Sequence, residues 1–373
     1  MTEEDIMANC RFTEGKKFGD WVIKKKLDEG GFGQVYMVEN MKTKDKAALK
    51  AESNEVEGGS AIKLEIRILV DLNKNGPKPH IPIYYHAAKR GKYCYMIMML
   101  LGENLKHLKN NGTNGKEKFS RGTWSRLGIQ CLYSVKYVHD CGYVHRDIKP
   151  NNFVLGHSED KQRARIVHIL DFGLARAYAL ERNGKLIARK ARGTAEFRGT
   201  LRYCSPNVHV KKEQGRGDDL FALLYVLVEF NGGLPWQQER DKGRVEAMKV
   251  VMPDRDVVMN MPVAMHVIPP HLRSLDCYQR PDYKLFFDAL NTVMKNEKAG
   301  PLTRYDWETQ ADVDAAIKNH KENGPAAWEN AEAFMASDPV GINGPPDDGA
   351  SIERQSKKTT AHSANKDGPL GAM

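Results

Sequence analysis

Two short polar segments constrain the fold of this chain more than any other feature of its sequence. In residues 144–153, Asp147 is followed two positions later by Lys149 and five positions later by Asn152. In residues 165–175, an apolar strand-like run delivers Asp171 into a turn. Carboxylate and amide oxygens suit hard cations such as Mg²⁺. Either segment alone could be a charged surface turn, but the pair at this spacing argues against chance.

The pattern along the chain predicts a small β-rich part followed by a larger helical part. Residues 21–50 alternate apolar and polar side chains around a glycine cluster, as hairpin strands do. Residues 61–72 have helical apolar spacing, and residues 93–101 form a strand-like run. From Trp124 onward, apolar residues recur at helical periods. Residues 220–230 indicate a buried helix too short to span a bilayer.

The two ends of the chain differ from this pattern. Residues 1–17 are predicted to be a flexible leader, without the apolar run of a signal peptide. Residues 301–373 turn polar and rich in Gly, Pro, Asn, Lys and Ser, which predicts a largely disordered tail. A short helix within residues 311–335 remains open.

The composition indicates an intracellular protein, in the cytoplasm, the nucleus or both. The 373 residues are 41% hydrophobic, enough for a large core, and no membrane segment is expected. The 6 cysteines are scattered and form no C-x-x-C pair, which argues against a zinc site or a disulfide framework.

The two polar segments resemble those of protein kinases. Residues 144–153 match a kinase catalytic loop, and residues 171–173 read Asp-Phe-Gly. The resemblance implies an α+β fold, the bilobal protein kinase fold. A small β-rich N-lobe is expected at about residues 18–100 and a mainly helical C-lobe at about residues 103–300. It also implies ATP and Mg²⁺ as cofactors.

The resemblance assigns roles to the polar side chains. Asp147 would orient the acceptor hydroxyl, and Lys149 would offset charge on the transferring phosphate. Asn152 and Asp171 would bind Mg²⁺. A lysine at position 149 with no arginine there favours Ser/Thr acceptors by resemblance.

Residues 27–35 resemble the kinase glycine-rich loop, although an ordinary glycine-containing β-turn remains an alternative. Gly30 and Gly33 fit the second and third glycines, whereas Asp28 occupies the place of the first. Asp28 could weaken ATP affinity or face solvent. The resemblance assigns these nucleotide-binding residues to the segment: Leu27, Gly30, Gly31, Gly33 and Val35.

Lys50 occupies the place of the lysine that contacts the α- and β-phosphates. Glu65, on the helix that follows, is its expected ion-pair partner. Glu52 and Glu55 are nearer in sequence but precede the helix, so we expect them to be solvated.

Residues 96–102 are expected to form the hinge. Backbone groups near Met99 and Leu101 would bind adenine, and Met98 would limit the back of the pocket. The same run could equally be a core strand, and both interpretations can hold at once because ligand pockets are mostly apolar.

Residues 197–207, 215–220 and 233–237 resemble the casein kinase I superfamily, and within it the tau-tubulin kinase-like branch. Ser205-Pro206-Asn207 stands where most kinases have Ala-Pro-Glu. The resemblance covers roughly residues 18–300.

This branch implies further roles. Asp219 would anchor the catalytic loop, Thr200 would support Asp147 and Lys149, and Arg202 would bind an anion on the substrate. Lys242 and Arg244 are candidates for a second anion-binding residue. The basic run at residues 189–192 could bind phosphate or be solvated. Activation would not require phosphorylation of the activation segment.

The sequence thus predicts an active, monomeric Ser/Thr protein kinase. Its net charge of +9 favours acidic or pre-phosphorylated protein substrates. Nucleic acid is not expected as a partner, because the basic residues lack aromatic interleaving. Two alternatives remain. One is a pseudokinase scaffold, for which Asp28 is the main support, and the other is a kinase-like fold that acts on a small molecule.

Overall fold

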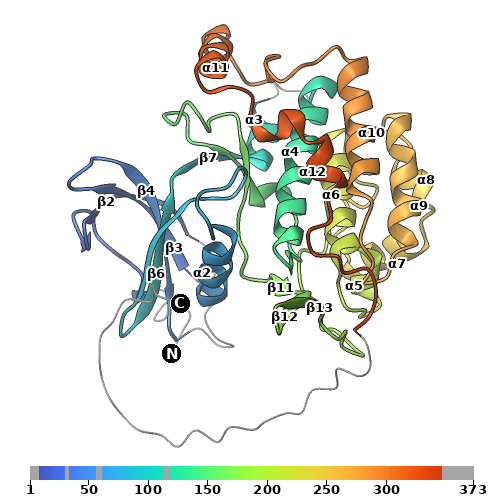
Figure 1. The fold of residues 1–373 in the computed structure, drawn as a ribbon, viewed down its shortest axis with the longest axis horizontal. Helices are drawn as coiled ribbons and strands as arrows, with labels where there is room; N and C mark the ends of the chain where they lie inside the picture. The colour runs from blue at the N-terminus through green and yellow to red at the C-terminus, as the bar shows by residue number, and fades with distance from the viewer. Residues whose placement is uncertain (1–7, 30–32, 56–60, 113–117, 347–373) are drawn as a thin grey trace, which may run out of the picture. The chain divides into compact units, whose positions relative to one another are not determined.

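The structure is a computed structural model that describes residues 8–29, 33–55, 61–112 and 118–346 (Figure 1). The chain divides into two compact units. The first contains the described residues up to Arg67, Tyr84–Met99 and the described residues from Pro345 onward, and the second contains Ile68–Ile83 and Leu100–Gly344.

The first unit is built on a six-stranded antiparallel sheet with the order β1-β2-β3-β4-β6-β5. The strands are β1 (Lys17–Phe18), β2 (Trp21–Glu29), β3 (Gly33–Asn40), β4 (Lys46–Ser53), β5 (Tyr84–Lys89) and β6 (Tyr93–Met99). Along β3, buried side chains such as Tyr36 and Val38 alternate with more exposed ones, as the pleat requires. The amphipathic helix α2 (Ala61–Leu72) follows β4.

The residues just before β1 differ from the expected flexible leader. Cys10 is fully buried, and Phe12 packs against the core of the sheet. The hydroxyl of Tyr36 donates to the carbonyl of Cys10 at 2.9 Å and accepts from the N–H of Phe12 at 2.9 Å. Two apolar side chains and two hydrogen bonds therefore tie residues 8–17 to the sheet, while residues 1–7 lie outside the described part.

The second unit is mainly helical. Its helices are α3 (Leu105–Asn111), α4 (Arg121–Asp140), η1 (Pro150–Asn152), α5 (Pro206–His209), α6 (Arg216–Phe230), α7 (Lys242–Val251), α8 (Asp254–Val257), η2 (Val263–Val267), α9 (Ile268–Arg273), α10 (Tyr283–Asn296), α11 (Gln310–Asn323), η3 (Ala327–Asn330) and α12 (Glu332–Ala336). Every residue of α6 is buried, which confirms the buried helix expected at residues 220–230. The indole N–H of Trp124 on α4 donates to the carbonyl of Leu227 at 2.8 Å and joins the two helices.

The second unit also contains seven short strands among its described residues. They are β7 (Leu101–Asn104), β8 (Tyr143–Val144), β9 (Phe153–Gly156), β10 (Val167–Ile169), β11 (Arg176–Ala177), β12 (Ala179–Arg182) and β13 (Lys185–Ala188). A β-rich unit and a helical unit in this order confirm the α+β class. Among the described helices, none combines the length and the apolar composition that crossing a bilayer requires.

Residues 301–346 differ from the largely disordered tail expected from composition. They contain α11, η3 and α12, and Figure 1 shows α12 beside α4 and α10. Their buried side chains are Tyr305, Val313, Trp328, Ala331, Met335, Val340 and Ile342. A few well-spaced apolar anchors are enough to fix a segment whose average composition is polar. Residues 347–373 lie outside the described part.

We expect Met335→Ala to lower the free energy of unfolding by about 2–5 kcal/mol, because it deletes a buried side chain and leaves a cavity. Met335 is fully buried, whereas Met259 is 66% exposed. Urea unfolding of both alanine variants measures the difference, with Met259→Ala as the matched control. Equal midpoints for the two variants would show that burial of the Met335 side chain does not stabilise the fold.

Candidate active site

The carboxylate of Asp147 is held from both sides. Its Oδ1 accepts a hydrogen bond from the hydroxyl of Thr200 at 2.7 Å, and its Oδ2 accepts one from the ammonium of Lys149 at 2.6 Å. The carboxylate is nearly buried, with Asp147 only 6% exposed. This hydrogen bond confirms the support expected from Thr200 for Asp147. A carboxylate held in this way is fixed in direction before any substrate arrives.

The loop that carries Asp147 is anchored by Asp219 on α6. The carboxylate of Asp219 accepts the backbone N–H groups of His145 at 2.6 Å and Arg146 at 2.8 Å. Its Oδ2 also lies 2.9 Å from Nε2 of His139. Burial alone would raise the pKa of Asp219, but hydrogen bonding and the charge of His139 outweigh it, so that pKa lies below its usual value. The predicted anchor is confirmed.

Backbone geometry brings the part of the activation segment that contains Gly199 and Thr200 close to this loop. Arg146 has a left-handed φ of +69°, and Gly199 has a φ of +113°. A Cβ on Gly199 would lie 2.6 Å from the carbonyl oxygen of Arg146. Only glycine therefore allows the residue before Thr200 to pass so near the catalytic loop.

The two predicted metal ligands lie at one end of the β9–β10 hairpin. Asn152 precedes β9 and Asp171 follows β10, and the N–H of Leu170 donates to the carbonyl of Asn152 at 2.8 Å. The side-chain amide of Asn152 donates to the carbonyl of Asp147 at 2.9 Å, which fixes the orientation of its oxygen. Asp171 carries a carboxylate and Asn152 an amide, the kinds of oxygen ligand that Mg²⁺ prefers.

Phe172 supports the same end of the hairpin. Its side chain is fully buried, and its ring centroid lies 5.3 Å from that of His145. Nε2 of His145 lies 2.9 Å from the carbonyl oxygen of Leu170. The two sequence motifs recognised separately are thus packed into one site.

In the first unit, the predicted Lys50–Glu65 ion pair is present. Nζ of Lys50 on β4 lies 2.5 Å from Oε2 of Glu65 on α2. The Glu65 side chain is only 2% exposed, whereas that of Lys50 is 29% exposed. A buried carboxylate requires such a partner, because an unpaired buried charge is costly.

Glu52 differs from its expected solvated state. It is 4% exposed, and its carboxylate accepts the backbone N–H groups of Ala61 at 3.2 Å and Ile62 at 2.6 Å. These N–H groups belong to the first turn of α2, where the helix has no internal partners for them. Glu52 therefore caps the helix that carries Glu65. Glu55 accepts a hydrogen bond from the side chain of Asn9 at 2.7 Å.

The predicted nucleotide-binding segment is only partly described, because Gly30 and Gly31 lie outside the described residues. Leu27 is 42% exposed, and Val35 is half-buried. A Cβ on Gly33 would lie 2.3 Å from the carbonyl oxygen of Ala51, so strand packing alone already requires glycine there. The exposed carboxylate of Asp28 accepts the N–H of Glu29 at 2.8 Å, which favours its solvent-facing alternative.

The predicted hinge residues begin as a core strand. Met98 and Met99 are buried on β6, opposite Ala48 and Ala47 of β4. Leu101 opens β7 and pairs with Gly156. The core-strand interpretation therefore holds for the two methionines.

The Ser-Pro-Asn segment is organised by Asp218. Its Oδ1 accepts from the hydroxyl of Ser205 at 2.5 Å and from the side-chain amide of Asn207 at 3.0 Å. Its Oδ2 accepts the N–H of Gly215 at 2.7 Å. Burial raises the pKa of Asp218, while these donors oppose the rise. Ser205 and Asn207 thus both donate hydrogen bonds to Asp218. A glutamate in place of Asn207, as in the Ala-Pro-Glu of most kinases, could not donate such a bond when ionised.

Arg202, the predicted substrate-anion residue, has partners within the chain. It donates to the carbonyl of Gln237 at 3.2 Å and lies 3.9 Å from the carboxylate of Glu229. Its side chain is still 38% exposed. Lys242 and Arg244 are exposed on α7, and Arg244 lies 3.8 Å from Glu239.

Sequence reasoning missed Lys249, which lies on α7 and contacts the backbone of the activation segment at Leu201 and Cys204. It is 1% exposed, and its ammonium donates to the carbonyls of Leu201 and, at 2.8 Å, Cys204. Burial lowers the pKa of Lys249 to about 8. The signal in the sequence is weak: Lys249 shares a helix face with buried Val245, four residues earlier.

Glu213 is a second missed residue. Arg192 donates to its two carboxylate oxygens at 2.6 Å and 2.7 Å, and Arg176 lies 3.6 Å away. Of the basic run at residues 189–192, Arg192 is therefore already paired with a carboxylate in this bidentate contact.

Comparison with known proteins decides the family. The protein kinase domain family matches residues 21–282. The chain belongs to the protein kinase family. It is 48% identical over 288 residues to a protein named inactive tau-tubulin kinase ttbk-6 from Caenorhabditis elegans, covering 76% of this chain and 97% of that protein. This similarity places it in the tau-tubulin kinase-like branch.

Two further relatives support the assignment. A probable serine/threonine-protein kinase of Dictyostelium discoideum is 36% identical over 83% of this chain and 61% of its own length. A putative casein kinase I of Caenorhabditis elegans is 33% identical over 77% of this chain and 83% of its own length.

We expect Lys249→Met to change how the stability of this chain depends on pH. The pKa of Lys249 is about 8 in the folded chain and about 10.4 when unfolded. Between these values the unfolded chain binds more protons, so stability rises with pH in the native protein. The methionine variant lacks this rise, and it leaves the carbonyl of Cys204 without its donor at a cost of about 1–3 kcal/mol.

Urea unfolding at about pH 7.5 and pH 9.5 measures both effects. Lys242→Met, an exposed change on the same helix, serves as the matched control. If both variants follow the native pH dependence, Lys249 does not titrate as described.

Proposed function

We propose that this chain is an ATP-dependent Ser/Thr protein kinase of casein kinase I type. The observation that carries the proposal is the fixed carboxylate of Asp147, held by Thr200 and Lys149. It lies on the loop whose Asn152 meets the Asp171 end of the β9–β10 hairpin. This arrangement supplies a base, a cation and two metal ligands, the parts that phosphoryl transfer requires.

Each side chain then has one task. Asp147 orients the acceptor hydroxyl through Oδ2 or Oδ1 and accepts its proton as the hydroxyl oxygen bonds to the γ-phosphorus. The bond from that phosphorus to the bridging oxygen breaks, and ADP leaves. Lys149 offsets the charge on the transferring group. Bound Mg²⁺, held by Asn152 and Asp171, would neutralise phosphate oxygens.

The nucleotide contacts belong to the same proposal. Lys50, fixed by Glu65, is assigned to the α- and β-phosphates of ATP. Leu27, Gly33 and Val35 border the glycine-rich loop. Gly30, Gly31, Met98, Met99 and Leu101 complete the proposed nucleotide-binding set.

A second candidate is a pseudokinase that binds nucleotide or partners without turnover. It is favoured by the relative named inactive, which shares 48% identity. In this chain, however, Lys50, Asp147, Lys149, Asn152 and Asp171 are all present. A melting-temperature rise with Mg²⁺-ATP but no phosphate transfer would identify the pseudokinase, whereas the kinase shows both.

The proposed partners are intracellular proteins with Ser/Thr acceptors, acidic or already phosphorylated. The net charge of +9 and the partly exposed guanidinium of Arg202 support this preference. A cytoplasmic or nuclear monomer completes the proposal.

We expect Asp147→Asn to lower kcat for Mg²⁺-ATP-dependent phosphorylation of casein by at least about 100-fold, because the amide cannot accept the hydroxyl proton. Incorporation of labelled phosphate measures the loss. Asp314→Asn, at an exposed position of α11, serves as the matched control. If the native protein incorporated no more labelled phosphate into casein than the Asp147→Asn variant, the proposal of an active kinase would be wrong.

We expect Arg202→Gln to raise KM for a phosphorylated peptide about tenfold, since one charge-assisted contact is lost. The KM for the same peptide without phosphate should change little. Steady-state kinetics on the peptide pair separate the two. Equal effects on both peptides would mean that Arg202 only supports the fold through Glu229 and Gln237.

A further inference from the structure

The end of the described tail packs against the activation segment. We call residues 335–343, which comprise the end of α12 and the residues after it, the strap. Val340 and Ile342 of the strap are buried in a cluster with Ala179 and Ala188. Tyr178 and Tyr278 pack against the same cluster. The strap therefore covers an apolar surface that the activation segment would otherwise expose.

This contact falls at the base of the β12–β13 hairpin. Ala179 and Ala188 face each other in the register and close the two four-residue strands. The tip is exposed, and Leu186 there is 45% exposed. An isolated two-stranded hairpin is only marginally stable in water. The hairpin therefore depends on apolar cover at its base, where Val340 and Ile342 supply it.

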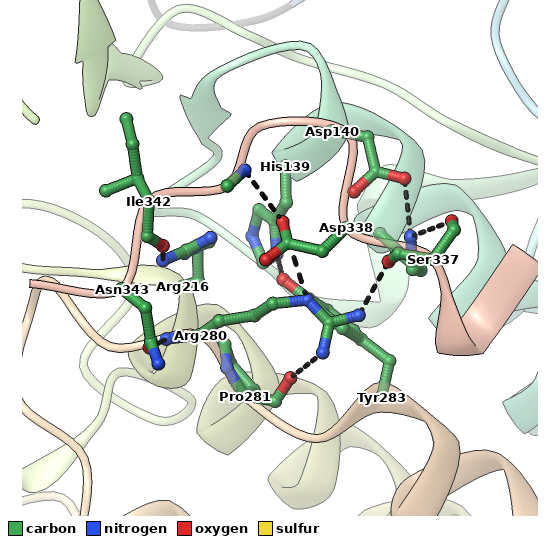
Figure 2. Close-up of polar contacts among 12 residues, drawn as sticks. His139, Asp140, Arg216, Arg280, Pro281, Tyr283, Ser337, Asp338, Ile342 and Asn343 are labelled. Carbon is green, nitrogen blue, oxygen red and sulfur yellow. Dashed lines mark hydrogen bonds and ion pairs between the residues drawn. The ribbon is translucent and has the colours of Figure 1, made fainter. Parts of the chain in front are cut away.

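Arg280, between α9 and α10, holds the strap through hydrogen bonds and an ion pair. Its guanidinium donates to the carbonyls of Ser337 at 2.7 Å and Met335 at 3.3 Å, and lies 3.8 Å from Asp338 (Figure 2). Its backbone N–H donates to the side chain of Asn343 at 2.7 Å. One residue thus fixes both ends of the strap.

Arg216, the first residue of α6, joins the strap to the machinery of the site. It is 2% exposed and donates to the carbonyls of Ile342 at 2.5 Å and Tyr278 at 2.7 Å. Its guanidinium lies 4.6 Å from the ring centroid of Tyr178, just before β12. The same helix carries Asp219, the anchor of the catalytic loop.

The start of the strap is docked on α4. Nζ of the buried Lys136 lies 3.2 Å from the hydroxyl of Ser337 and 2.5 Å from Asp140. The ring of Phe334, one residue before the strap, stacks on Tyr133 at 4.2 Å. Polar and aromatic contacts thus position the strap before it reaches the hairpin.

We propose that the strap is a positioning element that orders the activation segment from β12 to Arg192. The chain leaving the hairpin is tied to the residues beside the strap. The backbone N–H of Arg189 donates to the backbone carbonyl of Tyr178 at 2.7 Å. The backbone N–H of Ala191 donates to the hydroxyl of Tyr278 at 2.8 Å. When the strap is released, residues 178–192 lose the apolar contacts that Val340 and Ile342 make with Ala179 and Ala188. The consequence for substrate binding rests on the proposed kinase function, but the ordering itself does not.

The test uses the full-length chain with Arg280→Gln, which releases the strap without changing the hairpin. We expect amide hydrogen exchange in residues 178–192 to speed up about tenfold, as expected for local opening. The KM for casein should rise severalfold while the KM for ATP stays unchanged. Arg273→Gln is the matched control, because Arg273 pairs with Asp254 and not with the strap.

A second variant guards against a purely structural effect of Arg280. Val340→Asp with Ile342→Asp should give the same faster exchange in residues 178–192, and the exposed change Val263→Asp should not. Unchanged exchange there in both strap variants overturns the proposal. If the native chain transfers no phosphate, the kinase function fails, and the exchange data alone still decide the strap.

Discussion

The buried carboxylate of Asp219 is the interaction on which the site depends. It satisfies two consecutive backbone N–H groups of the catalytic loop, at a point where Arg146 adopts a left-handed conformation. A loop in that conformation cannot satisfy those N–H groups within a helix or a sheet. The position of Asp147 relative to α6 is therefore set by one side chain, which is kept ionised by His139 and the loop itself.

Buried and partly buried carboxylates organise the activation segment in the same way. Asp218 gathers Ser205 and Asn207, and Glu213 pairs with Arg192. Glu229 is fully buried and accepts from Lys106 at 2.6 Å and from the hydroxyl of Tyr203. Each carboxylate carries several charge-assisted hydrogen bonds, which offset the cost of its burial. The segment is thereby held by groups already present in the chain.

The tail is held by a different kind of contact. Guanidinium groups of Arg216 and Arg280 bind backbone carbonyls of the strap, and apolar side chains cover the hairpin base. Arginine suits this role because its planar fork donates several hydrogen bonds in fixed directions. The C-terminal residues are consequently part of the second unit up to Gly344.

The sequence by itself determined the family, the α+β class and the polar residues of the catalytic loop, because those groups are close in sequence and their spacing is constrained by chemistry. It also predicted the Lys50–Glu65 pair and the Asp219 anchor, through resemblance. Only the tertiary structure decided the roles of Glu52, Glu213 and Lys249, since their partners are distant or depend on which face of an element is buried. The tail shows the same limit. Average composition predicted disorder, whereas a few apolar side chains, each matched to a surface elsewhere in the chain, fixed residues 301–346 in place.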